Sequence, residues 1–262
     1  VAMALRSRSY QQQVADLARA LEGDELVLHY QPKVDLVSGE VIGVEALVRW
    51  EHPERGLLLP VEFICYLDDP VLYMPFGRWV VREALSQLRA WDEEGLSLAA
   101  SINISGRHLQ ERGFAAELEN CLTQFSDIDP ARLELEVLET SALEDLEKVG
   151  PIIASCRGLG VSVAIDDFGT GYSSLVYLRD LGADTLKVDQ TFVRAMLDNS
   201  GDRAIVEGVI RLAQVFDRRV VAEGVETEAH SLDLLRLGCQ FGQGWGIARA
   251  MHAEGAELAF SY

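Results

Sequence analysis

The sequence lacks an apolar run long enough to cross a membrane, and its first residues lack the apolar core of a signal peptide. The 4 cysteines lie far apart without a Cys-x-x-Cys pair, which favours reduced, buried thiols in the cytoplasm. Basic residues are also few, with 23 Lys and Arg against 42 Asp and Glu. The net charge of −19 argues against a protein that wraps a DNA or RNA duplex.

Strand-like and helix-like patterns alternate along the chain, which predicts an α/β fold with mostly parallel strands. Eight strand-like segments favour a closed barrel in a single domain. The first two are joined only by residues 36–40, which is too short for a crossover helix, so we expect that pair to be antiparallel. The expected strands are 26–34, 41–50, 97–105, 132–139, 161–167, 184–190, 218–225 and 239–247.

Helical patterns separate most of these strands, and several end at Gly, as helix C-caps do. Residues 7–23 form an amphipathic pattern that we expect to be a helix. Because the chain does not begin with Met, we expect it to be a fragment, with residues 1–23 as a connector and 24–262 as one domain. Other expected helices are 76–95, 147–160, 202–216 and 227–238.

Polar residues occupy one face of strand after strand when each strand is read with a period of two. Barrel interiors are usually filled by Val, Ile and Leu. Carboxylates that converge in such a space need compensating charge, and one lysine would not neutralise them. Their oxygen atoms suit Mg²⁺, Mn²⁺ or Ca²⁺, so the pattern predicts a divalent-cation site. The polar positions are Glu45, Asn103, Glu134, Glu136, Asp166, Lys187, Glu223 and Gln243.

Each of these residues alone has a more ordinary explanation. A Glu or Asp in a strand is usually a solvated or salt-bridged surface residue, and Asp often begins a loop. The loop after Asp166, with Gly169 and Gly171, is compatible with a tight turn in which Ser173 caps a helix. We base the metal-site prediction on seven strands that share one polar face.

Eight ordered segments resemble the blocks of the EAL-domain family of cyclic di-GMP phosphodiesterases: ELVLHYQPKVDL, VEALVRWEHPERGLLLPVEF, INIS, LELEVLE, AIDDFGTGYSSL, LKVDQTFV, VAEGVET and GCQFGQG. They span roughly residues 24–249 and include a literal Glu45-Ala46-Leu47. The resemblance implies a modified TIM-like (β/α)8 barrel with one antiparallel strand. It also implies a bacterial hydrolase that cleaves cyclic di-GMP to linear pGpG.

The resemblance further implies two cations, Mg²⁺ or Mn²⁺, and in-line attack by a water that they activate. The ligands of the first ion would be Glu45, Asn103, Glu136 and Asp166. Those of the second would be Asp166, Asp167 and Glu223. Ca²⁺ should inhibit, because its larger and looser coordination shell fits this geometry badly. The implied catalytic residues are Lys187, Glu223, Asp167 and Gln243, with Glu223 as proton acceptor or as metal ligand only.

Other residues match positions that contact the nucleotide, namely Gln31, Leu47 and Arg49. The alternative for Arg49 is a rim residue that pairs with Glu51 or Glu54. Glu139 matches the acid that holds the DDFGTGYSSL loop, which in the family links the metal site to a dimer interface. The implied partners are cyclic di-GMP, a second copy of the chain and an upstream sensory or GGDEF domain. The implied location is the cytoplasm, or the cytoplasmic part of a larger protein that a membrane anchors.

The sequence departs from the family pattern at three places. Leu138 replaces a usual Thr, Ala250 replaces a usual Pro, and residues 65–75 differ in a segment expected beside the nucleotide groove. A receptor that binds cyclic di-GMP without turnover is one alternative, but such receptors usually lose a metal ligand and every matched ligand is present here. A second alternative is an enolase-like barrel with Lys187 as base. It gives no reason for Asn103 or the DDFGTGYSSL loop.

Overall fold

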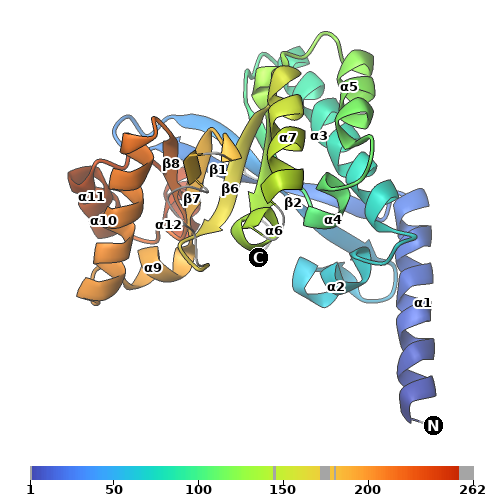
Figure 1. Ribbon diagram of the computed structural model, residues 1–262. Helices are drawn as coiled ribbons and strands as arrows, with labels where there is room; N and C mark the ends of the chain where they lie inside the picture. Colours follow the sequence, from blue (N-terminus) through green and yellow to red (C-terminus); the bar gives the residue numbers. More distant parts are fainter. Residues whose placement is uncertain (1, 144–145, 172–177, 180, 254–262) are drawn as a thin grey trace.

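The computed structural model describes residues 2–143, 146–171, 178–179 and 181–253 (Figure 1). Eight of its described strands close into a ring, because β1 pairs with both β2 and β9. Only β1 is antiparallel to its two neighbours in the ring, and the remaining ring pairs are parallel. The predicted barrel with one antiparallel strand is thus confirmed. The ring consists of β1 (Leu26–Asp35), β2 (Val41–His52), β4 (Ala100–Asn103), β5 (Leu133–Leu138), β6 (Ser162–Phe168), β7 (Thr185–Val188), β8 (Arg219–Ala222) and β9 (Phe241–Gln243).

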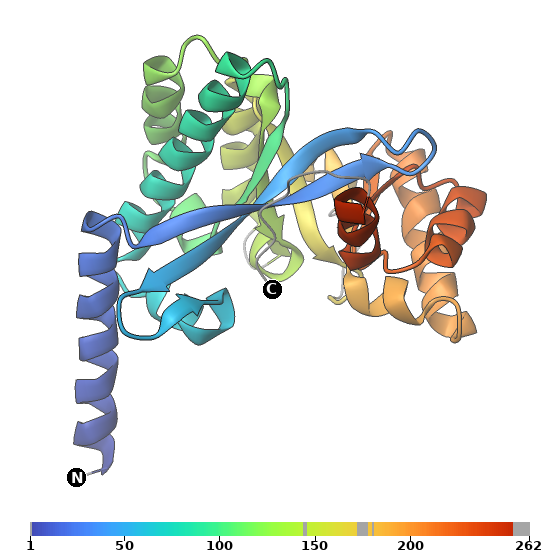
Figure 2. The same cartoon turned by 180° about the vertical axis from the view of Figure 1, so that it is seen from behind.

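A short strand that the sequence patterns did not predict, β3 (Gly56–Leu58), pairs with the end of β2 outside the ring. Helices join most of the parallel strands and lie in two groups on either side of the ring, whereas β1 and β2 cross the side that faces the viewer in Figure 2 (Figures 1 and 2). Among the described residues, none of the helices combines the length and apolar character that a membrane crossing requires. The helices are α1 (Ala2–Glu22), α2 (Ile64–Leu67), α3 (Tyr73–Glu93), α4 (Gly106–Leu109), α5 (Phe114–Gln124), α6 (Glu139–Leu143), α7 (Leu146–Gly158), α9 (Gln190–Ala195), α10 (Ser200–Val215), α11 (Glu228–Leu237) and α12 (Trp245–Ala253).

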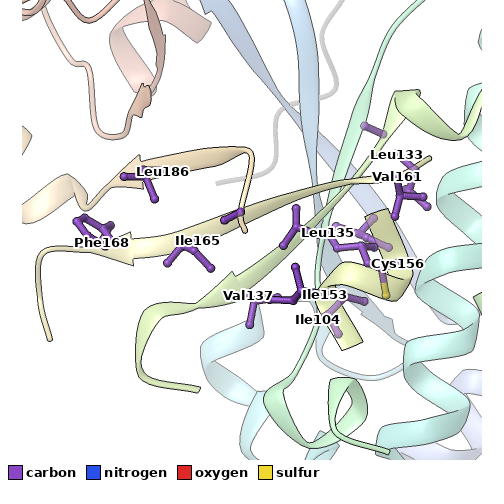
Figure 3. Close-up of a cluster of buried hydrophobic side chains, with 14 of the residues drawn as sticks. Ile104, Leu133, Leu135, Val137, Ile153, Cys156, Val161, Ile165, Phe168 and Leu186 are labelled. Carbon is purple, nitrogen blue, oxygen red and sulfur yellow. The ribbon is translucent and has the colours of Figure 1, made fainter. Parts of the chain in front are cut away.

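The main apolar core lies between the outer face of the barrel and its helices. Figure 3 shows this packing, in which Leu135 and Val137 of β5 lie near Ile153 and Cys156 of α7. Successive residues of a strand point to opposite faces, so the aliphatic positions turn outward and the polar positions turn into the lumen. The alternation that the sequence predicts for β5 and β6 is confirmed by the burial of Leu135 and Ile165 in this core.

A second apolar cluster joins the N-terminal helix to the barrel. Leu17 of α1 packs there with Trp50, whose indole Nε1 donates a hydrogen bond to Glu25 Oε2 at 2.9 Å. Leu67 and Leu72 belong to the same cluster, so the divergent segment 65–75 packs toward α1. The boundary at residue 23 stays a prediction. The cysteines are free and three are buried, but Cys65 is exposed, so the expectation of buried thiols was wrong for that residue.

We predict that truncation of two leucines of β5 affects stability to very different extents, because the two side chains lie on different faces of the strand. Leu135 is 1% exposed and Leu138 is 42% exposed. Leu135→Ala should lower the free energy of unfolding by about 2–5 kcal/mol. Leu138→Ala, the matched control, should change it by less than about 0.5 kcal/mol. Urea denaturation measures both, and equal effects would contradict the assigned faces of β5.

Candidate functional site

Lys187 lies at the centre of a polar layer inside the barrel. It lies on the lumen face of β7, it is fully buried, and its ammonium contacts four carboxylates from four other parts of the ring. Its Nζ lies 2.6 Å from Glu136 Oε2, 2.7 Å from Glu223 Oε1, 3.0 Å from Asp166 Oδ1 and 3.2 Å from Glu45 Oε2. The structure therefore brings together the acids that the strand patterns placed on one face.

One ammonium does not balance these carboxylates. Burial, opposed in part by Lys187, raises the pKa of Glu223 to about 8, and burial raises that of Asp166 to about 6. Burial also acts to raise the pKa of Glu136, but Lys187 and Lys33 outweigh it and hold the value at about 2. Burial lowers the pKa of Lys187 while the carboxylates raise it, and the net pKa lies well above its ordinary range. The ionised forms of Glu223 and Asp166 are thus disfavoured unless more positive charge enters the layer.

Lys33 is a second buried lysine of the lumen, directly below this layer, that the sequence patterns did not indicate. It extends from β1, is 5% exposed, and its Nζ lies 2.7 Å from Glu136 Oε1 and 3.1 Å from Glu134 Oε2. Lys33 follows Gln31 at the second position along β1, so both side chains lie on the same face of the strand. This shared face with a predicted site residue is the sequence signal that could have indicated Lys33.

Two amides orient Glu45, which lies within β2. Asn103 Nδ2 donates to Glu45 Oε1 at 2.9 Å, at the exposed end of β4. Gln243 Nε2 donates to Glu45 Oε2 at 2.7 Å and to Glu223 Oε1 at 3.0 Å. Gln243 Oε1 is buried and accepts no hydrogen bond from the described residues. The amides fix two carboxylates and leave a buried acceptor.

Asp166 and Asp167 are neighbours in β6, yet both carboxylates belong to the site. Asp167 has a φ of 53°, and the β6–β7 register shifts between Ile165 and Phe168. Asp tolerates the left-handed region better than most residues, and an irregularity of this kind re-aims side chains at a strand end. Burial, together with the neighbouring Asp189, raises the pKa of Asp167.

The carboxylates form two groups that are compact enough to hold cations. Within each group the candidate ligand atoms lie within 4.8 Å of one another, and Asp166 belongs to both. All donors are oxygen atoms, as hard divalent cations prefer, and the excess negative charge of the layer requires positive charge. The residues therefore fit divalent cations. The groups are Glu45, Glu136 and Asp166, and Asp166, Asp167 and Glu223.

The loop after β6 is tied to the start of α6. Glu139, which is 1% exposed, accepts hydrogen bonds through Oε2 from the N–H groups of Gly169 at 2.9 Å and Gly171 at 3.2 Å. A Cβ atom at Gly171 would lie 3.0 Å from Glu139 Oε1, so the close approach favours glycine. The expected helix cap Ser173 lies outside the described residues.

A cleft of about 330 Å³ opens beside the carboxylates, and the polar layer contributes Glu45, Glu223 and the amide of Gln243 to its wall. Its lining also includes the three residues predicted to contact a nucleotide: Gln31, Leu47 and Arg49.

Arg49 is buried, its Nη1 donates to the carbonyl oxygen of Val48 at 2.9 Å, and burial lowers its pKa. Segment 65–75, which the structure describes in full, contributes none of the lining residues, so it does not form the cleft wall as expected.

Sequence reasoning missed eight further residues that line this cleft, including several with large polar or aromatic side chains that could contact a ligand. Gln190 and Arg194 lie on α9, directly after β7, and loops at that end of barrel strands commonly form binding sites. Arg194 pairs with Glu226 at 2.8 Å. Tyr30 and Trp245 also line the cleft. Only their position beside strand ends could have indicated them.

Comparisons with known proteins agree with this geometry. The sequence model of the family described as EAL domain matches residues 14–250. The chain is 42% identical over 240 residues to the bifunctional diguanylate cyclase/cyclic di-GMP phosphodiesterase MucR of Pseudomonas aeruginosa, covering 91% of this chain and 35% of that protein. It is 37% identical over 242 residues to the cyclic di-GMP phosphodiesterase PdeR of Escherichia coli, covering 92% of this chain and 36% of that protein.

A solved structure, the PaMucR phosphodiesterase in complex with c-di-GMP, matches with a TM-score of 0.86 at 42% identity and covers 91% of this chain and 96% of that chain. The chain spans little more than a third of the length of the two curated relatives. The family match covers most of the chain, and the barrel, the Glu45-Ala46-Leu47 strand and the carboxylate groups agree with it. The chain belongs to the EAL domain family.

Proposed function

We propose that this chain hydrolyses one phosphodiester bond of cyclic di-GMP to give linear pGpG, with two divalent cations held in the barrel mouth. The proposal rests on one observation. Two clusters of three carboxylate residues share Asp166, and they lie beside the cleft that Gln31 and Arg49 line. Two relatives that are 42% and 37% identical to this chain over the aligned residues are named as cyclic di-GMP phosphodiesterases, one of them as bifunctional, which supports the same substrate.

We assign the first cation to Glu45, Asn103, Glu136 and Asp166, and the second to Asp166, Asp167 and Glu223. Mg²⁺ or Mn²⁺ suits such oxygen donors. Divalent cations, when bound there, supply Lewis-acid activation of water and stabilise the negative charge of the phosphodiester.

The chain's own residues orient the reaction. Lys187 adds a fixed positive charge to the layer, which favours the negative charge that develops on the phosphoryl oxygens. Gln243 Oε1, which is buried without a partner among the described residues, is placed to accept a hydrogen bond from the attacking water. Glu223, which lines the cleft, is our candidate for the group that takes the water's proton.

The cleft supplies the contacts for the dinucleotide. The planar guanidinium of Arg49 can donate to a phosphate oxygen or to a guanine edge. Gln31 offers an amide and Leu47 an apolar surface on the same wall. The bound cations and Arg49 make the electrostatic potential in the cleft positive, so an anionic substrate is attracted there despite the negative net charge of the chain.

We also propose three features of the wider context by analogy with the family. The chain forms a homodimer through the loop that Glu139 holds, and it acts with an upstream sensory or GGDEF domain. It works in the cytoplasm, or as the cytoplasmic part of a longer protein. The relative MucR is named as bifunctional, which supports an additional domain in the full-length protein.

The reaction product tests the proposed function directly. With Mg²⁺ and cyclic di-GMP, the chain should yield pGpG, detected by chromatography. Glu45→Gln removes a proposed cation ligand and should lower kcat by roughly 100-fold or more. Mutation of residues that only hydrogen-bond to a metal ligand already lowers activity by up to about 100-fold. The exposed Glu94→Gln is the matched control and should retain the rate. Binding of cyclic di-GMP without product would instead support the receptor alternative.

Cation removal should also change stability. Treatment with EDTA should abolish turnover, and added Mn²⁺ should raise the Tm, because the ions bind the folded carboxylate groups. The rise should be on the order of 5 °C or more at roughly 100 times the Kd. Asp166→Asn, which alters the shared ligand, should lose most of that rise, whereas the exposed Asp198→Asn should keep it. Differential scanning fluorimetry measures the shift, and identical shifts in both variants would refute the shared-ligand assignment.

Calcium provides a separate test of the two-cation arrangement. Ca²⁺ added to the Mg²⁺-supported reaction should inhibit pGpG formation, because its longer bonds and higher coordination number suit these ligands poorly for in-line attack. Inhibition should be relieved by excess Mg²⁺ if the two ions compete for the same carboxylates. Undiminished turnover with saturating Ca²⁺ as the only divalent ion would count against the arrangement.

A further inference from the structure

Lys33 is the buried charge for which the proposed reaction has no use. Its side chain is only 6% exposed and lies among lumen residues below the carboxylate layer. The Nζ atom lies 2.7 Å from Glu136 Oε1, whereas the ammonium of Lys187 lies 2.6 Å from Glu136 Oε2. Each oxygen atom of Glu136 therefore has an ammonium of its own.

The two ammonium groups bind Glu136 from different levels of the barrel. Lys187 also contacts Glu45 and Asp166, which belong with Glu136 to one candidate cation group. Lys33 instead contacts Glu134 at 3.1 Å, and both line a small lower cavity of about 50 Å³. Oε2 of Glu136 is thus on the side of the cation group, and Oε1 is engaged on the far side.

The antiparallel course of β1 places Lys33 at this depth. Gln31 of the same strand lines the cleft, and Lys33 follows two residues later on the same face, farther into the lumen. The β1–β2 register shifts between Lys33 and Val34, so the strand is irregular at this point. Thr185 fixes the lower partner, because its Oγ1 donates to Glu134 Oε1 at 2.7 Å.

This arrangement bears on which cation the site takes. Ca²⁺ binds six to eight oxygen atoms and often uses both oxygens of a carboxylate, whereas Mg²⁺ requires a compact octahedral shell. A Glu136 that turned both oxygens toward a cation would have to break its buried ion pair with Lys33, which is costly in a low-dielectric interior.

We propose that Lys33 is a positioning residue that restricts Glu136 to coordination through one oxygen and so favours Mg²⁺ or Mn²⁺ over Ca²⁺. This inference rests on the proposed binding of a cation by Glu136. A residue that only neutralised the lower lumen would affect the affinity for both ions equally. The selectivity between ions, and not the activity, is therefore the property to measure.

Isothermal titration calorimetry of the intact chain tests the inference with Mn²⁺ and Ca²⁺ as the probes. The variant Lys33→Met/Glu134→Gln removes one positive and one negative charge, so the local net charge is kept. The ratio of the Ca²⁺ Kd to the Mn²⁺ Kd should fall on the order of 10-fold, as expected when a partner that orients a metal ligand is lost. Glu134→Gln alone is the matched control and should keep the wild-type ratio, because Lys33 still holds Glu136.

An unchanged ratio in the double variant would overturn the role of Lys33 while leaving the proposed function intact. Failure of the wild-type chain to bind either ion would overturn both. A crystal structure of the wild-type chain with Mn²⁺ provides a second measurement that does not require the variant to fold. It should show Glu136 bound through one oxygen and Lys33 on the other, and a Glu136 bound through both oxygens would refute the proposal.

Discussion

The ammonium of Lys187 inside a ring of four carboxylates is the interaction on which the rest of the site depends. Carboxylates from separate strands converge at one depth of the lumen because every strand alternates its faces and the barrel closes. The ammonium groups of Lys187 and Lys33 offset only part of the charge of these acids, and burial still raises the pKa of Glu223 to about 8. The remaining negative charge makes this layer a place for cations, and the layer lies where the cleft opens.

The surrounding structure keeps this charged layer ordered. The outer faces of the strands bury aliphatic side chains against helices, which allows the inner faces to be polar without loss of a core. Asp167 adopts a left-handed backbone so that two consecutive acids serve one site, and Glu139 binds the loop that follows. Strain and close packing are thus concentrated at the strand end that carries the acids. The same strand end connects the site to a loop that another copy of the chain is proposed to contact.

Much of the fold could be predicted from the sequence, because strand alternation and short connections are local signals. The short link before β2 was enough to predict the antiparallel strand, and the parity of the acids was enough to predict their convergence. Lys33 was missed because a single lysine in a strand is ordinarily a surface residue, and its burial depends on partners 101 and 103 residues away. Arg194 was missed because only the closed ring brings residues of α9 and β1 to the same cleft. The packing of segment 65–75 on α1 likewise depends on a non-local contact that no pattern encodes.

The central claim is that cations compensate for the acids in the barrel mouth. Anomalous X-ray diffraction from crystals grown with Mn²⁺ and cyclic di-GMP tests it most directly, because manganese can be located independently of the protein atoms. We expect two anomalous peaks, one beside Glu45 and Glu136 and one beside Asp167 and Glu223, with Asp166 in contact with both. Density for the nucleotide in the cleft without any anomalous peak among these carboxylates would contradict the claim.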